Sequence, residues 1–258
     1  MEPIHALLLS IIEGITEFLP VSSTGHLILA TKLLGIPETE FTKSFDIIIQ
    51  LGAIMSVVTL YFAKIVKQPS LIKPLVIAFI PTGIGGLLLY KVVKTYLLAN
   101  DLLVVVNLAG IGALLIGLEW YWKKHPAKTQ ETVLTLPPGK LMLIGLFQAF
   151  AMIPGVSRSA STIVGGMFSG LSRSDAVELS FLLAVPTMAA ATGLDLLKSA
   201  HFFTPNEYGL LAIGFIVSWI TALFVIKGFI KFVAHGTFTW FGIYRIIAAT
   251  AYWLIMRA

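Results

Sequence analysis

Long apolar runs, separated by short polar segments, extend along the chain from one end to the other. A helix that crosses the hydrocarbon core of a membrane needs about 20 mostly apolar residues. Six runs reach this length, and each predicts a membrane-spanning helix. They cover residues 45–63, 74–96, 102–122, 178–197, 208–230 and 238–256. The pattern therefore predicts an all-α integral membrane protein with six transmembrane helices.

Two further apolar regions are interrupted where the six runs are continuous. Residues 4–34 are broken near Glu17 and Pro20, and residues 141–172 are broken near Pro154. Irregular backbone at membrane depth is tolerated only where protein or a water-filled cavity surrounds it. We therefore expect two re-entrant helical hairpins, each entering the bilayer and leaving it on the same side.

The two interrupted regions also repeat each other. The segments "EGITEFLPVSSTGH" (13–26) and "QAFAMIPGVSRSAST" (148–162) align at an offset of about 135 residues, which pairs Glu13 with Gln148. Each half then holds one hairpin and three spans, and an odd number of crossings inserts the second half upside down. Such inverted-topology repeats place their site near the bilayer midplane, among broken helices at the repeat interface. The single membrane domain, 1–258, is thus divided into a first repeat (1–122), a linker loop (123–140) and a second repeat (141–258).

The composition supports a lipid environment. Apolar residues make up 57% of the chain and charged residues 12%, and the mean hydropathy is +0.91. Ordinary soluble domains are about 45–50% apolar and about 25% charged. A disordered chain, a water-soluble enzyme and a nucleic-acid-binding domain are therefore excluded, and no nucleic-acid partner is expected. The chain has no cysteine, which excludes disulfides, thiolate metal sites and cysteine nucleophiles.

Basic residues fall unequally on the two sides of the predicted membrane. The richer side carries Lys64, Lys67, Lys73, Lys123, Lys124, Lys128, Lys140, Arg173, Lys227 and Lys231, and the poorer side carries Lys32, Lys43, Lys91, Lys94, Lys198 and Arg257. Basic residues collect in cytoplasmic loops, so the side with ten is predicted to be cytoplasmic. Both termini and the first hairpin would then open toward the outer face.

Two acidic residues in the first hairpin are candidates for metal binding. Glu13 and Glu17 are four residues apart, so a helix presents them on one face. A charged side chain at the centre of a spanning helix costs about 2.5–3.5 kcal/mol. Either both carboxylates extend to the membrane interface, or they line a wet cavity and bind a divalent cation or share general-base work. Ligands that are all oxygen favour Mg²⁺ or Ca²⁺.

The same hairpin places three hydroxyl groups beside a glycine and a histidine, in "PVSSTGH". One of Ser22, Ser23 and Thr24 can be explained as a helix cap, but three in a row exceed what a cap requires. Ser23 is a candidate nucleophile. His26 is a candidate base or acid, and a structural role is an equal alternative.

The second hairpin turns at "PGVSRSAST" and has the character of an anion site. A helix that starts here directs free backbone N–H groups and a positive dipole end into the cavity. Arg158 adds a planar guanidinium suited to two hydrogen bonds with a phosphate. A phosphate with its bound cation would suit both hairpins, because the carboxylates of the first would bind the cation and the guanidinium of the second would bind the phosphate. The residues assigned to phosphate binding are Ser22, Thr24, Ser157, Arg158, Ser159 and Thr162.

The segments "EGITEFLPVSSTGH" and "PGVSRSAST" resemble the two signature regions of the bacterial undecaprenyl pyrophosphate phosphatases, the family linked to bacitracin resistance. The resemblance covers essentially the whole chain. It implies an inner-membrane enzyme that hydrolyses undecaprenyl pyrophosphate to the monophosphate, for reuse as carrier lipid in cell-wall synthesis. It places the family's acidic motif on Glu13 and Glu17, its proposed nucleophile on Ser23, its histidine on His26 and its arginine on Arg158.

Two mechanisms stay open at this point. Ser23 attacks the terminal phosphorus while Glu17 or His26 takes its proton, or water held by Glu17 and His26 attacks directly. The rival from another class is a transporter or lipid flippase, because inverted repeats with re-entrant hairpins are a transporter architecture. A lipid phosphatase of the phosphatidate-phosphatase type is excluded, because it needs an Arg-Pro motif that the chain lacks.

Other features are weaker signals. Arg245 could form a structural ion pair or support the site from behind, and Asn107 is expected to hydrogen-bond between helices. The sequence leaves the oligomeric state open, a homodimer included.

Overall fold

A computed structural model describes residues 1–92, 97, 100–125, 131–199 and 204–256. Within these residues the chain forms ten α-helices and one short 3₁₀ helix at Pro69–Leu71. The α-helices are α1 (Pro3–Thr16), α2 (Ser23–Leu33), α3 (Glu40–Lys67), α4 (Ile72–Val92), α5 (Asp101–Lys124), α6 (Pro138–Phe150), α7 (Arg158–Phe168), α8 (Arg173–Ser199), α9 (Pro205–His235) and α10 (Thr239–Ile255). The predicted all-helical class is confirmed.

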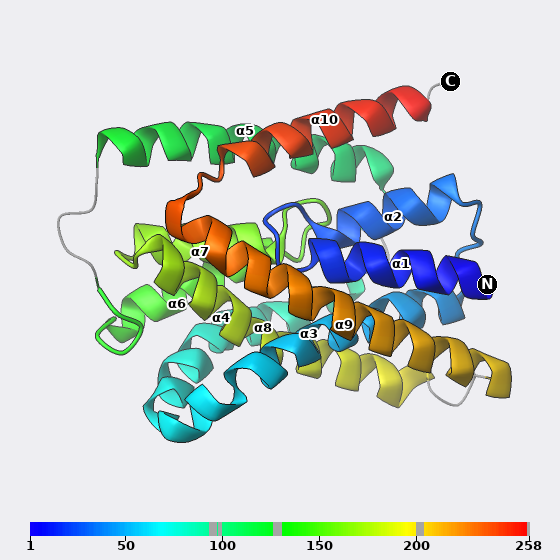
Figure 1. The fold of residues 1–258 in the computed structure, drawn as a ribbon, viewed down its shortest axis with the longest axis horizontal. Coiled ribbons are helices and arrows are strands. Elements are labelled where there is room, and N and C mark those ends of the chain that lie inside the picture. The colour runs from blue at the N-terminus through cyan, green and yellow to red at the C-terminus, as the bar shows by residue number, and fades with distance from the viewer. Residues whose placement is uncertain (93–96, 98–99, 126–130, 200–203, 257–258) are drawn as a thin grey trace.

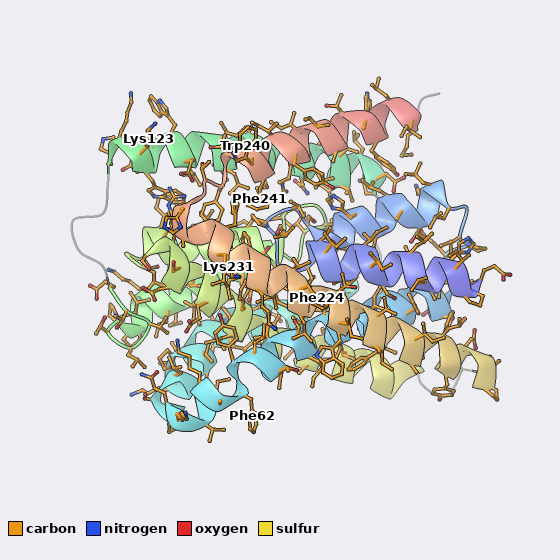
Figure 2. All side chains as sticks on the ribbon, viewed as in Figure 1. Phe62, Lys123, Phe224, Lys231, Trp240 and Phe241 are labelled. Atoms are coloured by element: carbon orange, nitrogen blue, oxygen red, sulfur yellow. The ribbon has the colours of Figure 1, made fainter. Side chains whose placement is uncertain are left out.

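In the described part of the chain, five helical segments are long and apolar enough to cross a membrane, namely those in α3, α4, α5, α8 and α9. The sixth predicted span corresponds to α10, whose 17 residues lie at the lower limit of about 17–25 for a crossing. Large apolar side chains cover much of the outside: Phe62, Phe224 and Trp240 are 64%, 72% and 65% exposed (Figure 2). Such a surface suits lipid rather than water.

Both interrupted regions form helical hairpins, α1 with α2 and α6 with α7, as the sequence predicts. Figure 1 shows the hairpins at opposite ends of the molecule, with their connecting turns close together at its centre. The turns are in contact, because Ser159 Oγ in the second hairpin donates a hydrogen bond of 2.7 Å to the carbonyl oxygen of Leu19 in the first. Two polar segments far apart in the chain thereby share one interior location.

The helices break at the turns for local reasons. Ser22 and Ser157 both adopt positive φ angles, 73° and 82°, which end the preceding turn and set the direction of the next helix. Each then caps that helix with its side chain: Ser22 Oγ accepts from the backbone N–H of Gly25, and Ser157 Oγ accepts from that of Ala160. The two turns therefore use the same capping arrangement.

The remaining helices enclose the hairpins. α9 packs against α1 and α3, α8 packs against α3 and α7, and α4 packs against α6. The core between them includes Phe18, whose ring packs edge-to-face against that of Phe181, with the ring centroids 5.2 Å apart. α5 and α10 pair along one side of the molecule (Figure 1). Their backbones approach closely because Gly112 faces Gly242, and a Cβ on either would lie under 3 Å from the other's carbonyl oxygen.

Candidate active site

The carboxylate of Glu17 lies at the centre of the polar cluster between the two turns. Its Oε2 accepts a hydrogen bond of 2.5 Å from Ser23 Oγ, and its Oε1 accepts one of 2.9 Å from Arg158 Nη2. The other terminal nitrogen of Arg158 donates to the carbonyl oxygen of Ser180 at 2.9 Å. Both charged side chains are nearly buried, 6% exposed for Glu17 and 11% for Arg158. The structure thus joins the predicted nucleophile, a carboxylate and the predicted phosphate-binding cation in one chain of contacts.

Helix geometry explains how these side chains meet. Ser23 is the first residue of α2 and Arg158 is the first residue of α7. Glu17 is the C-cap residue that directly follows α1, at the start of the turn that leads to α2. Each side chain therefore starts at a turn rather than along a helix. Since the two turns are in contact, the side chains converge.

This arrangement is suited to activating Ser23. A serine hydroxyl is a weak nucleophile unless a neighbouring base takes its proton. Glu17 already accepts that proton in a hydrogen bond, and the ion pair with Arg158 fixes the orientation of the carboxylate. Of the two bases that the sequence leaves open, the contacts favour Glu17.

His26 is held away from this proton transfer. Its Nδ1 lies 2.8 Å from the carbonyl oxygen of Ser22, and its Nε2 lies 2.8 Å from the hydroxyl of Tyr244 on α10. A carbonyl oxygen only accepts, so Nδ1 carries the hydrogen, and Nε2 of the neutral ring accepts from Tyr244. Ser23 is not among its hydrogen-bond partners. Tyr244 carried no signal in the sequence pattern, because it is one of several aromatic residues on an apolar helix.

Glu13 is fully buried, and both of its carboxylate oxygens lack a hydrogen-bond partner among the described residues. A carboxylate buried in this way requires a compensating partner, such as a cation. No group of three or more His, Cys, Asp or Glu in the described part of the chain is placed to hold a metal ion. Two carboxylates still suit Mg²⁺, which usually completes its shell with water and substrate phosphate oxygens.

Four of the hydroxyl residues assigned to phosphate are engaged within the protein. Ser22 and Ser157 cap their helices, and Ser159 joins the two turns. Thr162 Oγ1 donates to Ser180 Oγ at 2.7 Å, while Thr24 is half-buried. Their contact with phosphate stays a prediction, and the structure gives the four engaged residues a role in shaping the turns.

Arg158 keeps unused donor capacity. Its Nε is buried and has no hydrogen-bond partner among the described residues, and its guanidinium lies 5.9 Å from the ring centroid of Phe18. Its two terminal nitrogens contact the carbonyl oxygen of Ser180 and the carboxylate of Glu17. A phosphate that entered the site would therefore compete with Glu17 for this guanidinium.

The fold and this cluster define a multi-helix membrane protein with a buried serine–carboxylate–guanidinium site. The family model described as bacitracin resistance protein BacA matches residues 6–251, and the chain belongs to this family. It is 52% identical over 250 residues to the undecaprenyl-diphosphatase of Aquifex aeolicus, covering 96% of each chain. It is 49% identical over 254 residues to the undecaprenyl-diphosphatase of a Sulfurihydrogenibium species, covering 98% of this chain and 99% of the relative. The undecaprenyl-diphosphatase of Persephonella marina is 49% identical over 244 residues, 95% of each chain. The family predicted from the two motifs is confirmed.

Proposed function

We infer that this chain is an undecaprenyl-diphosphatase of the bacterial membrane, which hydrolyses undecaprenyl pyrophosphate to undecaprenyl phosphate and inorganic phosphate. Family membership supports the reaction. The observation that carries the site is the bridging position of Glu17, with Ser23 on one oxygen and Arg158 on the other. Release of the monophosphate recycles the carrier lipid for cell-wall synthesis, which is how such an enzyme contributes to bacitracin resistance.

The mechanism we propose starts from Ser23. As Glu17 takes its proton, Ser23 Oγ forms a bond to the terminal phosphorus, and the phosphoanhydride bond breaks to release undecaprenyl phosphate. Arg158 and the N-terminal ends of α2 and α7 stabilise the charge on the transferring group. Glu17 passes this proton to the leaving undecaprenyl phosphate. Water then attacks the phosphoserine, Glu17 takes the proton of the water and returns it to Ser23 Oγ, and the bond between Ser23 Oγ and phosphorus breaks to release inorganic phosphate. Direct attack by water is the alternative, and a trapped phosphate on Ser23 distinguishes the two.

We also propose that Glu13 and Glu17 hold a divalent cation, Mg²⁺ or Ca²⁺. The two unpartnered oxygens of buried Glu13 support this assignment. When bound, the cation would neutralise phosphate charge and polarise the phosphorus toward attack.

In the membrane, we propose six crossings and two re-entrant hairpins arranged as an inverted repeat. The opposed hairpins in Figure 1 and the matched positive-φ serines support a repeat. The imbalance of basic residues supports a site that opens to the outer face. The prenyl chain would stay in lipid while the pyrophosphate enters between the turns.

The test is phosphate release from undecaprenyl pyrophosphate by purified protein in detergent, with and without EDTA. The site variants are Glu17→Ala and Arg158→Ala. The control variants are Glu119→Ala and Arg173→Ala, because Glu119 and Arg173 also form a partly buried ion pair but lie outside the site. We expect release that needs a cation and that only the first pair of variants abolishes. Folded wild-type protein that releases no phosphate would overturn the enzyme and leave a transporter on this scaffold.

A further inference from the structure

Arg245 on α10 is a fully buried guanidinium whose hydrogen-bond partners are all backbone carbonyl oxygens. Its Nη1 donates to Pro20 at 3.1 Å, and its Nη2 donates to Gly155 at 2.5 Å. Further hydrogen bonds of 3.2–3.3 Å reach the carbonyl oxygens of Leu108, Asn107 and Val156. One side chain therefore contacts α5 and both hairpin turns at once.

The carbonyl oxygens that Arg245 holds are equivalent in the two hairpins. Pro20 comes three residues before Ser23, and Gly155 comes three residues before Arg158. The guanidinium thus holds the same point of each turn, just ahead of the residue that each turn supplies to the site. Asn107 adds a hydrogen bond of 2.8 Å from its Nδ2 to the carbonyl oxygen of Pro154, which ties the second turn to α5 as well.

The charge of Arg245 has no carboxylate partner in the described part of the chain, where the ion pairs involve other residues. The ion pair considered for it from the sequence is therefore not formed there. Burying a charge costs free energy, and five carbonyl oxygens compensate for it here in place of a counter-ion. Because the buried charge of Arg245 contacts both turns, we expect it to have a function beyond packing.

We propose that Arg245 is a positioning residue that fixes the separation of the two turns, and through it the distance from Ser23 and Glu17 to Arg158. The proposal rests on the phosphatase function proposed above. The physical reason is that the nucleophile and the base belong to the first hairpin, whereas the Arg158 guanidinium belongs to the second. Any change in the separation of the turns therefore changes the reacting geometry directly.

The decisive variant is Arg245→Met, which keeps most of the side-chain volume and removes all five hydrogen bonds. A displacement of about 1 Å at a reacting centre can cost about 100-fold in rate, so we expect kcat to fall by about that factor. KM for the lipid substrate should change much less, since the prenyl chain and the residues that face the phosphates remain. Arg245→Lys keeps the charge but cannot reach all three elements at once, and we expect an intermediate kcat.

The matched control is Arg173→Met, which removes a partly buried arginine that binds Glu119 and the carbonyl oxygen of Gly236, away from the turns. We expect it to lower Tm without lowering kcat per folded molecule. Steady-state kinetics and thermal unfolding are measured on the same preparations in detergent.

A lower kcat in Arg245→Met, at a Tm close to that of Arg173→Met, supports positioning. Unchanged kcat in folded Arg245→Met, or a raised KM with unchanged kcat, overturns it. Where Arg245→Met does not fold, Arg245→Lys decides by the same criteria. If the wild-type protein also releases no phosphate, the proposed function fails instead of this inference.

Discussion

The two hairpins share one backbone design and differ in chemistry. α2 and α7 each have 11 residues, and each follows a serine with positive φ whose side chain caps the helix. The first residue after the cap is Ser23 in one hairpin and Arg158 in the other. Equivalent positions thus supply a hydroxyl group and a guanidinium, and both contact Glu17. Neither hairpin contains a complete site.

The second difference lies in the first helix of each hairpin, at Glu13 on α1 and Gln148 on α6. Both side chains are fully buried. Gln148 Nε2 donates to Thr82 Oγ1 and to Thr187 Oγ1, each at 2.9 Å. Glu13 has no such partner among the described residues. The neutral amide ties helices together, whereas Glu13 makes no such link within the described residues.

The largest effect is expected at the residue that joins the hairpins. Glu17→Gln keeps the shape of the side chain but removes the charge that accepts the Ser23 proton and binds Arg158. Loss of a general base lowers kcat by about 10²- to 10⁴-fold. Phosphate release measured over time, with equal amounts of folded protein, checks this. Activity within a few-fold of wild type would exclude Glu17 as the base.

A smaller effect is expected when the first hairpin is made to resemble the second. Glu13→Gln removes one of two proposed cation ligands while it preserves side-chain volume. We expect a higher cation concentration for half-maximal activity, and a loss of about 10²-fold or less in kcat at saturation, comparable to that of one electrostatic stabilising group. Titration of activity with Mg²⁺ and Ca²⁺ measures both quantities. An unchanged titration would show that Glu13 does not hold the cation.

The reverse exchange, Gln148→Glu, tests the comparison from the other side. It removes the two donated hydrogen bonds and places a buried carboxylate opposite the hydroxyls of Thr82 and Thr187. Both hydroxyls already donate to backbone carbonyl oxygens, so a carboxylate gains a donor only if one of those bonds breaks. An unsatisfied buried group costs about 1–3 kcal/mol, and more when charged. We expect a lower Tm in detergent, with cation dependence unchanged. Gln148→Leu is the control, since it removes the hydrogen bonds without adding charge.

The sequence predicts much of this arrangement because the signals are local. Apolar length gives the helices, and the proline and serine runs give the breaks near Pro20 and Pro154. It does not predict the contacts that depend on backbone atoms. Arg158 and Arg245 bind backbone carbonyl oxygens, which every residue type has. A sequence motif therefore cannot identify these acceptors. A different limit applies to His26, because its side-chain partner Tyr244 lies 218 residues away and no local pattern joins the two.

The smallest effect concerns the shared backbone itself, at Ser22 and Ser157. Replacement by alanine loses the cap, which is worth about 1 kcal/mol, and leaves a Cβ at positive φ. Replacement by glycine also loses the side-chain cap, but glycine accepts positive φ without strain and costs only a few tenths of a kcal/mol at this position. We therefore expect Tm to fall in the order wild type, glycine variant, alanine variant.

That order should be the same in both hairpins, because the two serines have similar φ angles and cap in the same way. Thermal unfolding of the four single variants in one detergent measures it. A matching order would show that the hairpins differ in chemistry alone. If glycine stabilised one turn and destabilised the other, the turns would carry different strain. The difference between the hairpins would then begin in the backbone, before any catalytic side chain is considered.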